Sequence, residues 1–298
     1  MASMITPKIP GSRSPRAWFA CAALLGAGLL AGCAIFHPHV FKTVAGLQLY
    51  SVRAQMTKDV DGTLAEVHAW GVKYVELAGT YGMTPAQFKA KLTEHDLDAI
   101  SGHFPYEEWS KDPQAVIDKA RDLKLVEVGC AWIPHSGAFD EATCRQAIAV
   151  FNRAGALAAK HHMQFFYHTH GYEFQPWQGE TLFDLLVKET DSRDVKFEMD
   201  IFWMVHGGQD PVRWLWKYPF RWELMHLKDM RKGTPTRLLT GSSDVKNDVA
   251  LGTGVIDLPS ILRTAREVGV QWYFIEDESP NSEEQIPQSL VYLRDLRR

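Results

Sequence analysis

Acidic and histidine side chains stand at the ends of short apolar segments over most of the chain. They are Glu76, His103, His168, His170, Asp200, His226 and Glu276. Four of them, His168, Asp200, His226 and Glu276, close four successive segments and together offer two imidazoles and two carboxylates. This mixed nitrogen and oxygen set suits a divalent cation, Mn2+ first, with Co2+, Mg2+ or Zn2+ as alternatives. It contains no thiolate, which argues against a structural zinc site.

The elements that must position these residues alternate regularly. Short apolar segments predict strands at 46–51, 73–77, 99–104, 125–130, 164–168, 195–200, 222–227 and 272–276. Amphipathic segments predict helices at 60–70, 84–95, 113–123, 141–161, 181–189, 211–218, 259–268 and 282–296. This alternation predicts an α/β fold, the (β/α)8 TIM barrel, as a single domain over residues 46–298. The carboxyl ends of the strands of such a barrel lie on one face, so we expect the acidic and histidine residues at these ends to converge there. Any one of the acidic residues alone would more often be a helix cap.

The first 45 residues carry the features of an export signal. Arg13 and Arg16 precede an apolar run over 17–31, the pattern of a secretory signal. The run ends in Leu30-Ala31-Gly32-Cys33, which resembles the bacterial lipobox. We therefore expect a signal peptide at 1–32, lipidation of Cys33, a tether over 33–45 and a periplasm-facing protein of the bacterial cell envelope. Its membrane contact would be the lipid anchor, and Ala34 after the cysteine favours the outer membrane.

The charge of the expected mature chain bears on its partners. Removing residues 1–32 takes away three basic residues and no acidic ones, so 29 Lys and Arg face 36 Asp and Glu, a formal charge of −7. That charge disfavours nucleic acid as a partner, and with it an apurinic-type endonuclease of the same barrel type.

Two cysteines, Cys130 and Cys144, belong to the predicted barrel. They could pair in an oxidising compartment. One ends a predicted strand and the other lies early in the next helix, and we expect two buried free thiols.

Several segments carry a family resemblance. Phe197-Glu198-Met199-Asp200-Ile201-Phe202-Trp203, Met225-His226-Leu227-Lys228-Asp229-Met230 and Gly252-Thr253-Gly254-Val255-Ile256-Asp257 resemble the xylose-isomerase-like sugar isomerase/epimerase family. Tyr167-His168-Thr169-His170-Gly171-Tyr172-Glu173-Phe174 is similar to a strand-five segment of the inosose-dehydratase branch. The resemblance implies that Asp200, His226 and Glu276 bind the metal. At the fifth strand, where many epimerases of the family place a Glu, this chain has His168, and Glu173 is a weaker candidate for the missing carboxylate.

A divalent cation at such a site would acidify the C–H bond next to a carbonyl and stabilise the resulting enediolate. The candidates for moving the proton are Glu276, His103, His170 and Glu173. Lys228 is a candidate for neutralising the oxyanion, or else a surface lysine paired with Asp229. The candidates for contacting the substrate are Tyr50, Trp132, Trp203 and Glu76, although aromatic residues near strand ends are also ordinary core. The segment 229–249 is long for a barrel loop and is expected to cover the site.

These residues favour a sugar isomerase or epimerase that acts through an enediolate. Because sugar phosphates are rare outside the cytoplasm, the expected substrate is a non-phosphorylated sugar or keto-sugar, with an oxidoreductase partner where the ketone must first be made. A metal-dependent lyase, either a dehydratase or an enzyme of keto-glycoside β-elimination, is the alternative, and His168 favours it. A non-catalytic sugar-binding lipoprotein is the second alternative.

Overall fold

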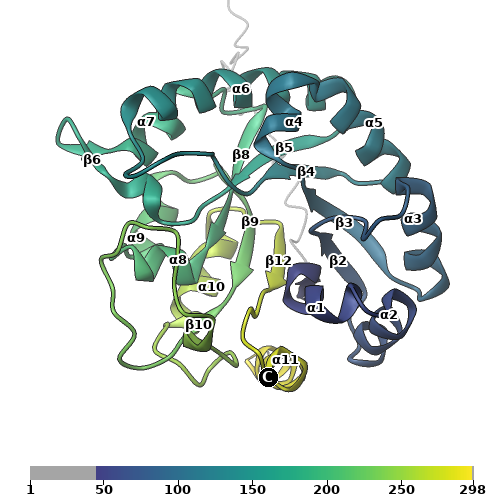
Figure 1. Cartoon of the computed structure of the whole chain (residues 1–298). Helices are drawn as coiled ribbons and strands as arrows, with labels where there is room; N and C mark the ends of the chain where they lie inside the picture. The colour runs from purple at the N-terminus through teal and green to yellow at the C-terminus, as the bar shows by residue number, and fades with distance from the viewer. Residues whose placement is uncertain (1–44, 297–298) are drawn as a thin grey trace, which may run out of the picture. The chain divides into compact units, whose positions relative to one another are not determined.

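Eight parallel strands form a closed barrel in the order β1-β12-β9-β8-β5-β4-β3-β2 (Figure 1). The computed structural model describes residues 45–296, so the predicted signal peptide, Cys33 and nearly all of the tether lie outside the described residues. The strands are β1 (Gly46–Gln48), β2 (Tyr74–Leu77), β3 (Asp98–His103), β4 (Glu127–Cys130), β5 (Gln164–His168), β8 (Val195–Asp200), β9 (Trp222–Leu227) and β12 (Trp272–Ile275). The predicted (β/α)8 barrel is confirmed.

Helices surround the barrel and alternate with its strands along the chain. They are α1 (Arg53–Met56), α2 (Val60–Ala69), α3 (Pro85–Glu94), α4 (Tyr106–Lys111), α5 (Pro113–Leu123), α6 (Glu141–Lys160), α7 (Leu182–Glu189), α8 (Ile201–His206), α9 (Pro211–Lys217), α10 (Leu258–Glu267) and α11 (Ser282–Asp295). Two short two-stranded antiparallel sheets, β6 (Pro176–Trp177) with β7 (Glu180–Thr181) and β10 (Asp229–Met230) with β11 (Asp248–Val249), lie in the loops. Among residues 45–296, none of the helices combines the length and hydropathy that crossing a bilayer requires.

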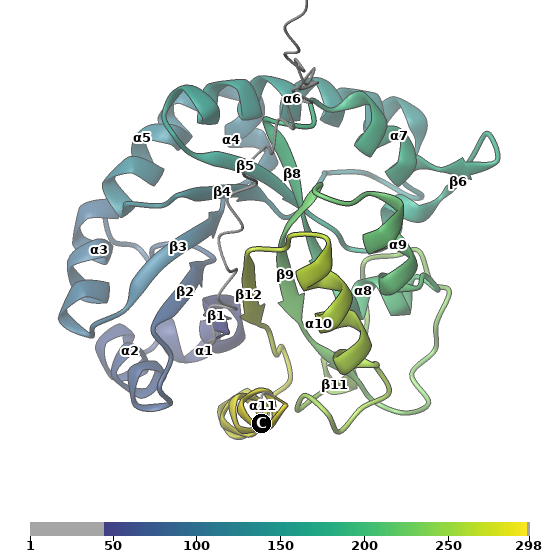
Figure 2. The ribbon, with the colours of Figure 1, turned by 180° about the vertical axis from the view of Figure 1, so that it is seen from behind.

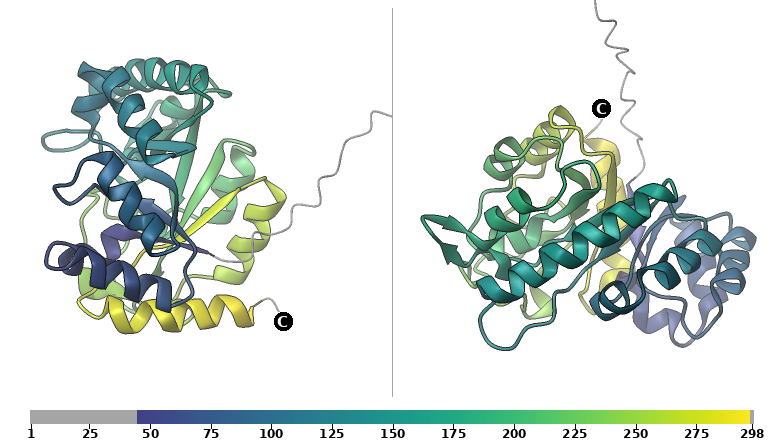
Figure 3. Two further views of the ribbon diagram at one scale, coloured as in Figure 1. Left: turned by 90° about the vertical axis from the view of Figure 1, so that its right-hand side faces the viewer. Right: turned by 90° about the horizontal axis from the view of Figure 1, so that it is seen from above.

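The last helix closes the ring by returning to the start of the barrel. Ser282 at the beginning of α11 donates a hydrogen bond from Oγ to the carbonyl of Ser51, at 3.0 Å. Figure 3 shows α11 in yellow lying along the N-terminal helices, and Figure 2 shows the α9 and α10 pair from behind. The first and last βα units are thereby joined as neighbours.

The first strand is shorter than the sequence pattern predicts. It ends at Gln48, and residues Leu49–Val52 form a 3-10 helix instead of continuing the strand. The cause is local, because the side-chain oxygen of Gln48 accepts a hydrogen bond from the backbone N–H of Tyr50, at 2.9 Å. Such side-chain bonds compete with strand pairing.

Helix ends follow the sequence signals closely. Thr84 caps α3 with a reciprocal capping box, and Asp210 caps α9 by accepting from Val212 N at 2.9 Å, each with proline at the first helical position. Asp200 caps α8, since its Oδ1 accepts from Trp203 N at 3.0 Å. This cap is important for the site, because it fixes the Asp200 carboxylate at the mouth of the barrel with one oxygen committed to the backbone.

The barrel interior is layered. Phe166, Leu224 and Phe274 form a separate buried apolar cluster inside the barrel. Each stands two residues before His168, His226 or Glu276, and residues two apart point to the same side of a strand. The apolar cluster therefore forms the floor on which the predicted ligands rest.

Candidate metal centre

The four predicted metal ligands come together at the carboxyl ends of neighbouring strands. One potential ligand atom from each of His168, Asp200, His226 and Glu276 lies within 4.8 Å of the others. They come from β5, β8, β9 and the residue after β12, which are consecutive in the barrel. All four side chains are buried. The convergence expected from strand order is thus what the structure shows.

The donor atoms are spaced as ligands of one ion. Nε2 of His168 lies 3.0 Å from Nδ1 of His226 and 3.6 Å from Oδ2 of Asp200. Nδ1 of His226 lies 3.1 Å from Oε2 of Glu276. Ligand atoms that each lie about 2 Å from one cation are separated by roughly 3 to 3.5 Å. Oδ2 of Asp200 is buried and has no hydrogen-bond partner, which a cation at this position would supply. The residues present therefore fit a divalent metal.

The other nitrogen of His226 is held from inside the barrel. Nε2 of His226 lies 2.6 Å from Oε1 of Glu76. Glu76 in turn accepts hydrogen bonds from Nε2 of Gln48, at 2.7 Å, and from Oγ of Ser101. A carboxylate on the far nitrogen of a metal-binding histidine fixes its tautomer and orientation. Glu76 is fully buried and does not line the cavity, so the prediction that it contacts substrate is wrong.

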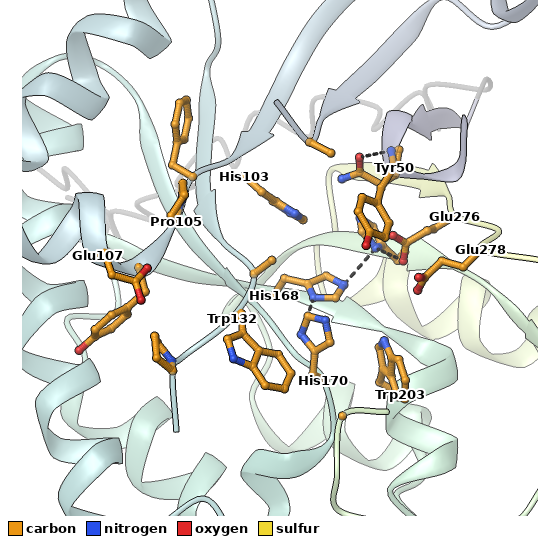
Figure 4. Close-up of a pocket in the computed structure, with 18 residues that line it drawn as sticks. Tyr50, His103, Pro105, Glu107, Trp132, His168, His170, Trp203, Glu276 and Glu278 are labelled. Atoms are coloured by element: carbon orange, nitrogen blue, oxygen red, sulfur yellow. Dashed lines mark hydrogen bonds and ion pairs between the residues drawn. The ribbon is translucent and has the colours of Figure 1, made fainter. Parts of the chain in front are cut away.

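A cavity of about 700 Å3 opens directly above the ligand group (Figure 4). His168, His226 and Glu276 line its inner part, and Tyr50, Trp132 and Trp203 line it as expected from the sequence. The carboxylates in its wall are Glu107, Glu276 and Glu278. No lysine or arginine of the described chain is among the lining residues. The described lining therefore offers a phosphate group neither a lysine nor an arginine.

Comparisons with known proteins agree with this geometry. Residues 64–296 match the model of the Xylose isomerase-like TIM barrel family. The chain belongs to this family.

Among curated members, this Xylose isomerase-like barrel is similar to the inosose dehydratase of Clostridium botulinum (strain Alaska E43 / Type E3), at 26% identity over 247 residues, which is 74% of this chain and 82% of that one. Inosose dehydratase of Geobacillus thermodenitrificans is 30% identical over 135 residues, 43% of this chain and 44% of the relative.

Solved structures share the fold. A sugar phosphate isomerase/epimerase from Parabacteroides distasonis ATCC 8503 superposes with a TM-score of 0.70 at 24% identity, covering 83% of this chain and 92% of that chain. The IolI protein, solved with a bound zinc atom, has a TM-score of 0.64 at 14% identity, covering 85% and 97%. The second of these structures shows that a barrel of this shape can hold a divalent ion.

A carboxylate that the sequence interpretation missed lies inside this Xylose isomerase-like barrel. Glu198 stands two residues before Asp200 on β8 and so points to the same side of the strand. Its Oε2 lies 3.0 Å from Nε2 of His103, and its Oε1 lies 3.2 Å from Nε2 of His226. Period-two spacing from Asp200 was the signal that could have found it. Glu76, His103, Glu198 and His226 form a second cluster that shares His226 with the first.

His103 faces the cavity with carboxylates behind it. Besides its bond to Glu198, its Nε2 lies 3.3 Å from Oε1 of Glu76. Burial by itself lowers the pKa of His103, but the Glu76 and Glu198 carboxylates raise it above its ordinary value. The protonated ring, which these carboxylates favour, can donate a proton, whereas only the neutral ring can accept one. The geometry thus favours His103 as an acid over the base considered from sequence.

His170 supports His168. The two Nδ1 atoms are 3.2 Å apart, so one ring can donate to the other while Nε2 of His168 stays in the ligand group. Burial lowers the pKa of His170 to about 3, and burial together with His226 brings the pKa of His168 well below its ordinary value. Both rings are therefore neutral at neutral pH. Neutral imidazole is the form that binds a metal, whereas His170 is a weak candidate for the catalytic base.

Glu173 does not replace the missing fifth-strand carboxylate. Its Oε1 accepts from the hydroxyl of Tyr167, at 2.5 Å, and from the backbone N–H of His170, at 2.9 Å. It is fully buried and is absent from the ligand group, so the structure contradicts the prediction that it loops back to the metal. Burial raises the pKa of Glu173 to about 7. Its role in this arrangement is to hold the backbone that carries His170.

Lys228 is neither a surface residue nor free. Its Nζ lies 2.7 Å from Oε1 of Glu278, 3.2 Å from Oε2 of Glu276 and 3.5 Å from Oδ2 of Asp248. Burial raises the pKa of Glu276, but the Lys228 and His226 charges outweigh it and bring that pKa well below the ordinary value. Lys228 therefore orients an ionised Glu276 and is not available to neutralise an oxyanion.

The alternative reading, in which Lys228 pairs with Asp229, also finds no support among the contacts of the described residues. Asp229 instead accepts hydrogen bonds from the backbone N–H groups of Met230, Gly252, Gly254 and Ile256. It organises the turn after β11, while Asp248 on that strand reaches Lys228. Gly241, within the long segment 229–249, lines the cavity, so this segment does border the site.

Proposed function

We propose that this chain is a divalent-metal-dependent lyase that acts on a non-phosphorylated sugar or cyclitol ketone. It removes the proton next to the carbonyl and expels the substituent on the following carbon. One observation carries the proposal: four buried donor groups, with Oδ2 of Asp200 left without a hydrogen-bond partner, surround one point at the floor of a cavity whose described lining holds no lysine or arginine. A bound metal would supply Lewis-acid stabilisation of the negative charge that develops on the carbonyl oxygen.

Two of the residues that line the cavity are placed to act as a base and an acid. Glu276, an ionised carboxylate of the ligand group, faces the cavity, and this position allows it to receive the proton. His103 lines the same cavity, and the two carboxylates behind it favour its protonated form. It can give a proton to the leaving oxygen. Their strands, β12 and β3, are separated in the barrel by β1 and β2, so the two groups approach a bound ring from different sides.

A carboxylate base, Glu276, combined with a histidine acid, His103, favours elimination over an epimerisation that uses two carboxylates. Epimerisation of that kind needs a second carboxylate at the fifth strand, where this chain has His168 and where Glu173 is turned into the wall. The inosose dehydratases to which the chain is similar are lyases by their name. The substrate is neutral on this proposal because a phosphate would meet Glu107, Glu276 and Glu278 rather than a lysine or arginine.

An isomerase or epimerase is the second candidate. The same base can remove the same proton, and His103 can return one to carbon instead of oxygen. The fold shared with the Parabacteroides sugar phosphate isomerase/epimerase supports this candidate at the level of architecture. A sugar-binding lipoprotein without catalysis would keep the cavity and would not depend on the ligand group.

We test these candidates by following inosose and a panel of keto-sugars in D2O by NMR. The proposal predicts loss of the substituent with formation of an unsaturated ketone, blocked by chelation and restored by Mn2+ or Zn2+. Deuterated isomers of unchanged composition would instead establish an isomerase. Binding without any exchange, unaffected by chelation, would establish a binding protein and contradict both enzyme proposals.

We also propose that the chain is a lipoprotein of the cell envelope, on the basis of the Leu30-Ala31-Gly32-Cys33 sequence. In a bacterial host, radioactive palmitate should label the full chain, and the Cys33→Ala variant should lose the label. Labelling that persists in the variant would contradict the assignment.

A further inference from the structure

The cavity is larger than one reacting ring needs. At about 700 Å3 it falls within the range of about 300–1,000 Å3 typical of pockets that bury drug-sized ligands, which exceed a single sugar. The ligand group occupies one end of it. Figure 4 shows His168 and Glu276 on one side of Trp132, and Pro105 and Glu107 on the other side. The part beyond Trp132 is therefore not explained by the reaction at the metal centre.

This outer part has the lining of a carbohydrate subsite. Its walls come from the loop after β3 with the start of α4, and from the loop after β4. The residues are Phe104, Pro105, Tyr106, Glu107, Trp132 and Pro134. Aromatic and proline faces suit the apolar face of a sugar ring, while the Glu107 carboxylate and the Tyr106 hydroxyl can bond to sugar hydroxyls.

Trp132 is a fixed platform rather than a loose surface residue. Its ring stacks on His135 at 5.1 Å between ring centroids, and it meets Tyr172 edge-on at 4.7 Å and His170 at 5.3 Å. Despite these contacts 39% of it remains exposed, on the lining of the cavity. A large aromatic surface that is already immobilised binds a partner at a small cost in conformational entropy.

We propose that the outer part is a subsite for a second sugar unit, so that the substrate is a keto-glycoside whose leaving group is a sugar. This inference rests on the proposed function, since it assigns the reacting ring to the metal centre. The base takes the proton next to the carbonyl, and the electrons of that C–H bond form a C=C bond. The C–O bond to the second sugar breaks, and its oxygen takes a proton from the acid. The products are an unsaturated keto-sugar and a free sugar, and no oxidant is consumed.

The subsite is tested by calorimetric binding of sugars that cannot react because they carry no ketone. The probes are glucose-, galactose- and mannose-based disaccharides, the matching methyl glycosides and the matching phenyl glycosides. For at least one sugar, the disaccharide should bind about tenfold or more tightly than the methyl glycoside, the increment expected of one good stacking platform. Trp132→Ala should bring that ratio close to one. Trp216→Ala, which removes a tryptophan on α9 that is 53% exposed and lies outside the cavity lining, should leave the ratio unchanged.

A second variant protects the test against loss of folding in Trp132→Ala. Glu107 is exposed, so Glu107→Ala is expected to fold and to lower the same ratio. Equal affinities of disaccharide and methyl glycoside, or no binding by any probe, would overturn the proposal. If only the phenyl glycosides bound more tightly than the methyl glycosides, the subsite would accept an aromatic leaving group. That result would overturn the assignment of a second sugar to the subsite.

The binding ratio separates the subsite from the proposed function. Because the platform does not touch the metal position, the ratio should be the same in excess Mn2+ and in EDTA. A ratio above tenfold with no chelation-sensitive exchange in D2O would retain the subsite and reject the lyase. Chelation-sensitive elimination with an affinity ratio near one would retain the lyase and reject the subsite.

Discussion

Glu76 and His226 form a hydrogen-bonded pair at 2.6 Å inside the barrel, on the side of the imidazole ring away from the ligand group. The pair holds the N–H of Nε2 and directs Nδ1 to the ligand group, where a metal would displace the Nδ1 proton that the surrounding carboxylates favour. Loss of such a partner typically weakens metal binding about 10- to 100-fold. We expect Glu76→Ala to have this effect and Glu76→Gln, which keeps an acceptor oxygen, to have a smaller one, as measured by competition with a metal-binding dye.

Glu127 provides the matched control for Glu76. It is another buried carboxyl inside the barrel, its Oε2 has no hydrogen-bond partner, and burial raises its pKa well above the ordinary value. Glu127→Gln should therefore leave metal affinity unchanged. A general fall in affinity in both variants would show that Glu76 acts only through the integrity of the barrel.

Asp200 makes metal binding depend on pH. Burial raises its pKa to about 7, against the opposing charge of Lys228. Below pH 7 a metal must displace a proton from this group, so the apparent affinity should fall by about tenfold per pH unit and binding should release a proton. Calorimetry in two buffers of different ionisation enthalpy measures the released proton. A proton count of zero at pH 6 would refute the predicted proton release.

In the metal-free protein, stability depends on pH with the opposite sign to metal affinity. Protonation of Asp200 removes a buried charge, so the contribution of Asp200 to the free energy of unfolding rises as pH falls below about 7.

Lys228 holds Glu276, Glu278 and Asp248 together in a buried position. Replacing one partner of a buried charge network leaves the others uncompensated and costs about 3–5 kcal/mol. We expect Lys228→Met to lower the free energy of unfolding by about this amount in urea titrations. Lys188→Met, which removes a surface pair with Glu180, should change stability by less than about 1 kcal/mol. Similar small effects for both variants would contradict the described network.

His103 is assigned to the leaving oxygen, and the assignment has a kinetic signature. His103→Gln should lower kcat by about 10²- to 10⁴-fold for substrates with poor leaving groups. Substrates whose leaving group is already acidic, such as nitrophenyl glycosides of a keto-sugar, should lose much less. A loss that does not depend on the leaving group would place His103 in proton removal or in structure.

The sequence predicted the parts of this molecule that obey strand and helix periodicity. The metal-ligand candidates could be found because the carboxyl ends of parallel strands lie on one face of the barrel; they are His168, Asp200, His226 and Glu276. The prediction of free buried thiols at Cys130 and Cys144 also agrees with the structure. The inner layer was not found. Glu198 stands inside a strand where apolar residues are usual, and the direction of Glu173 depends on the left-handed Gly171 that starts a short 3-10 helix.

Side-chain partners also escaped prediction where they join distant segments. Lys228 was expected to neutralise an oxyanion or else to pair with its neighbour Asp229, but its partners come from β11 and from the segment after β12. Glu76 was placed among substrate contacts because strand ends face the cavity, yet its neighbours Gln48 and Ser101 tie it below the surface. Such choices depend on register between strands, which one sequence does not specify.

Elemental analysis of the purified protein tests the central claim most directly. We predict about one divalent ion per chain in the wild type, little in Asp200→Ala and His226→Ala, and turnover that ends on exhaustive chelation and returns with added metal. A wild-type protein that contains no divalent ion and keeps full turnover after chelation would contradict the account.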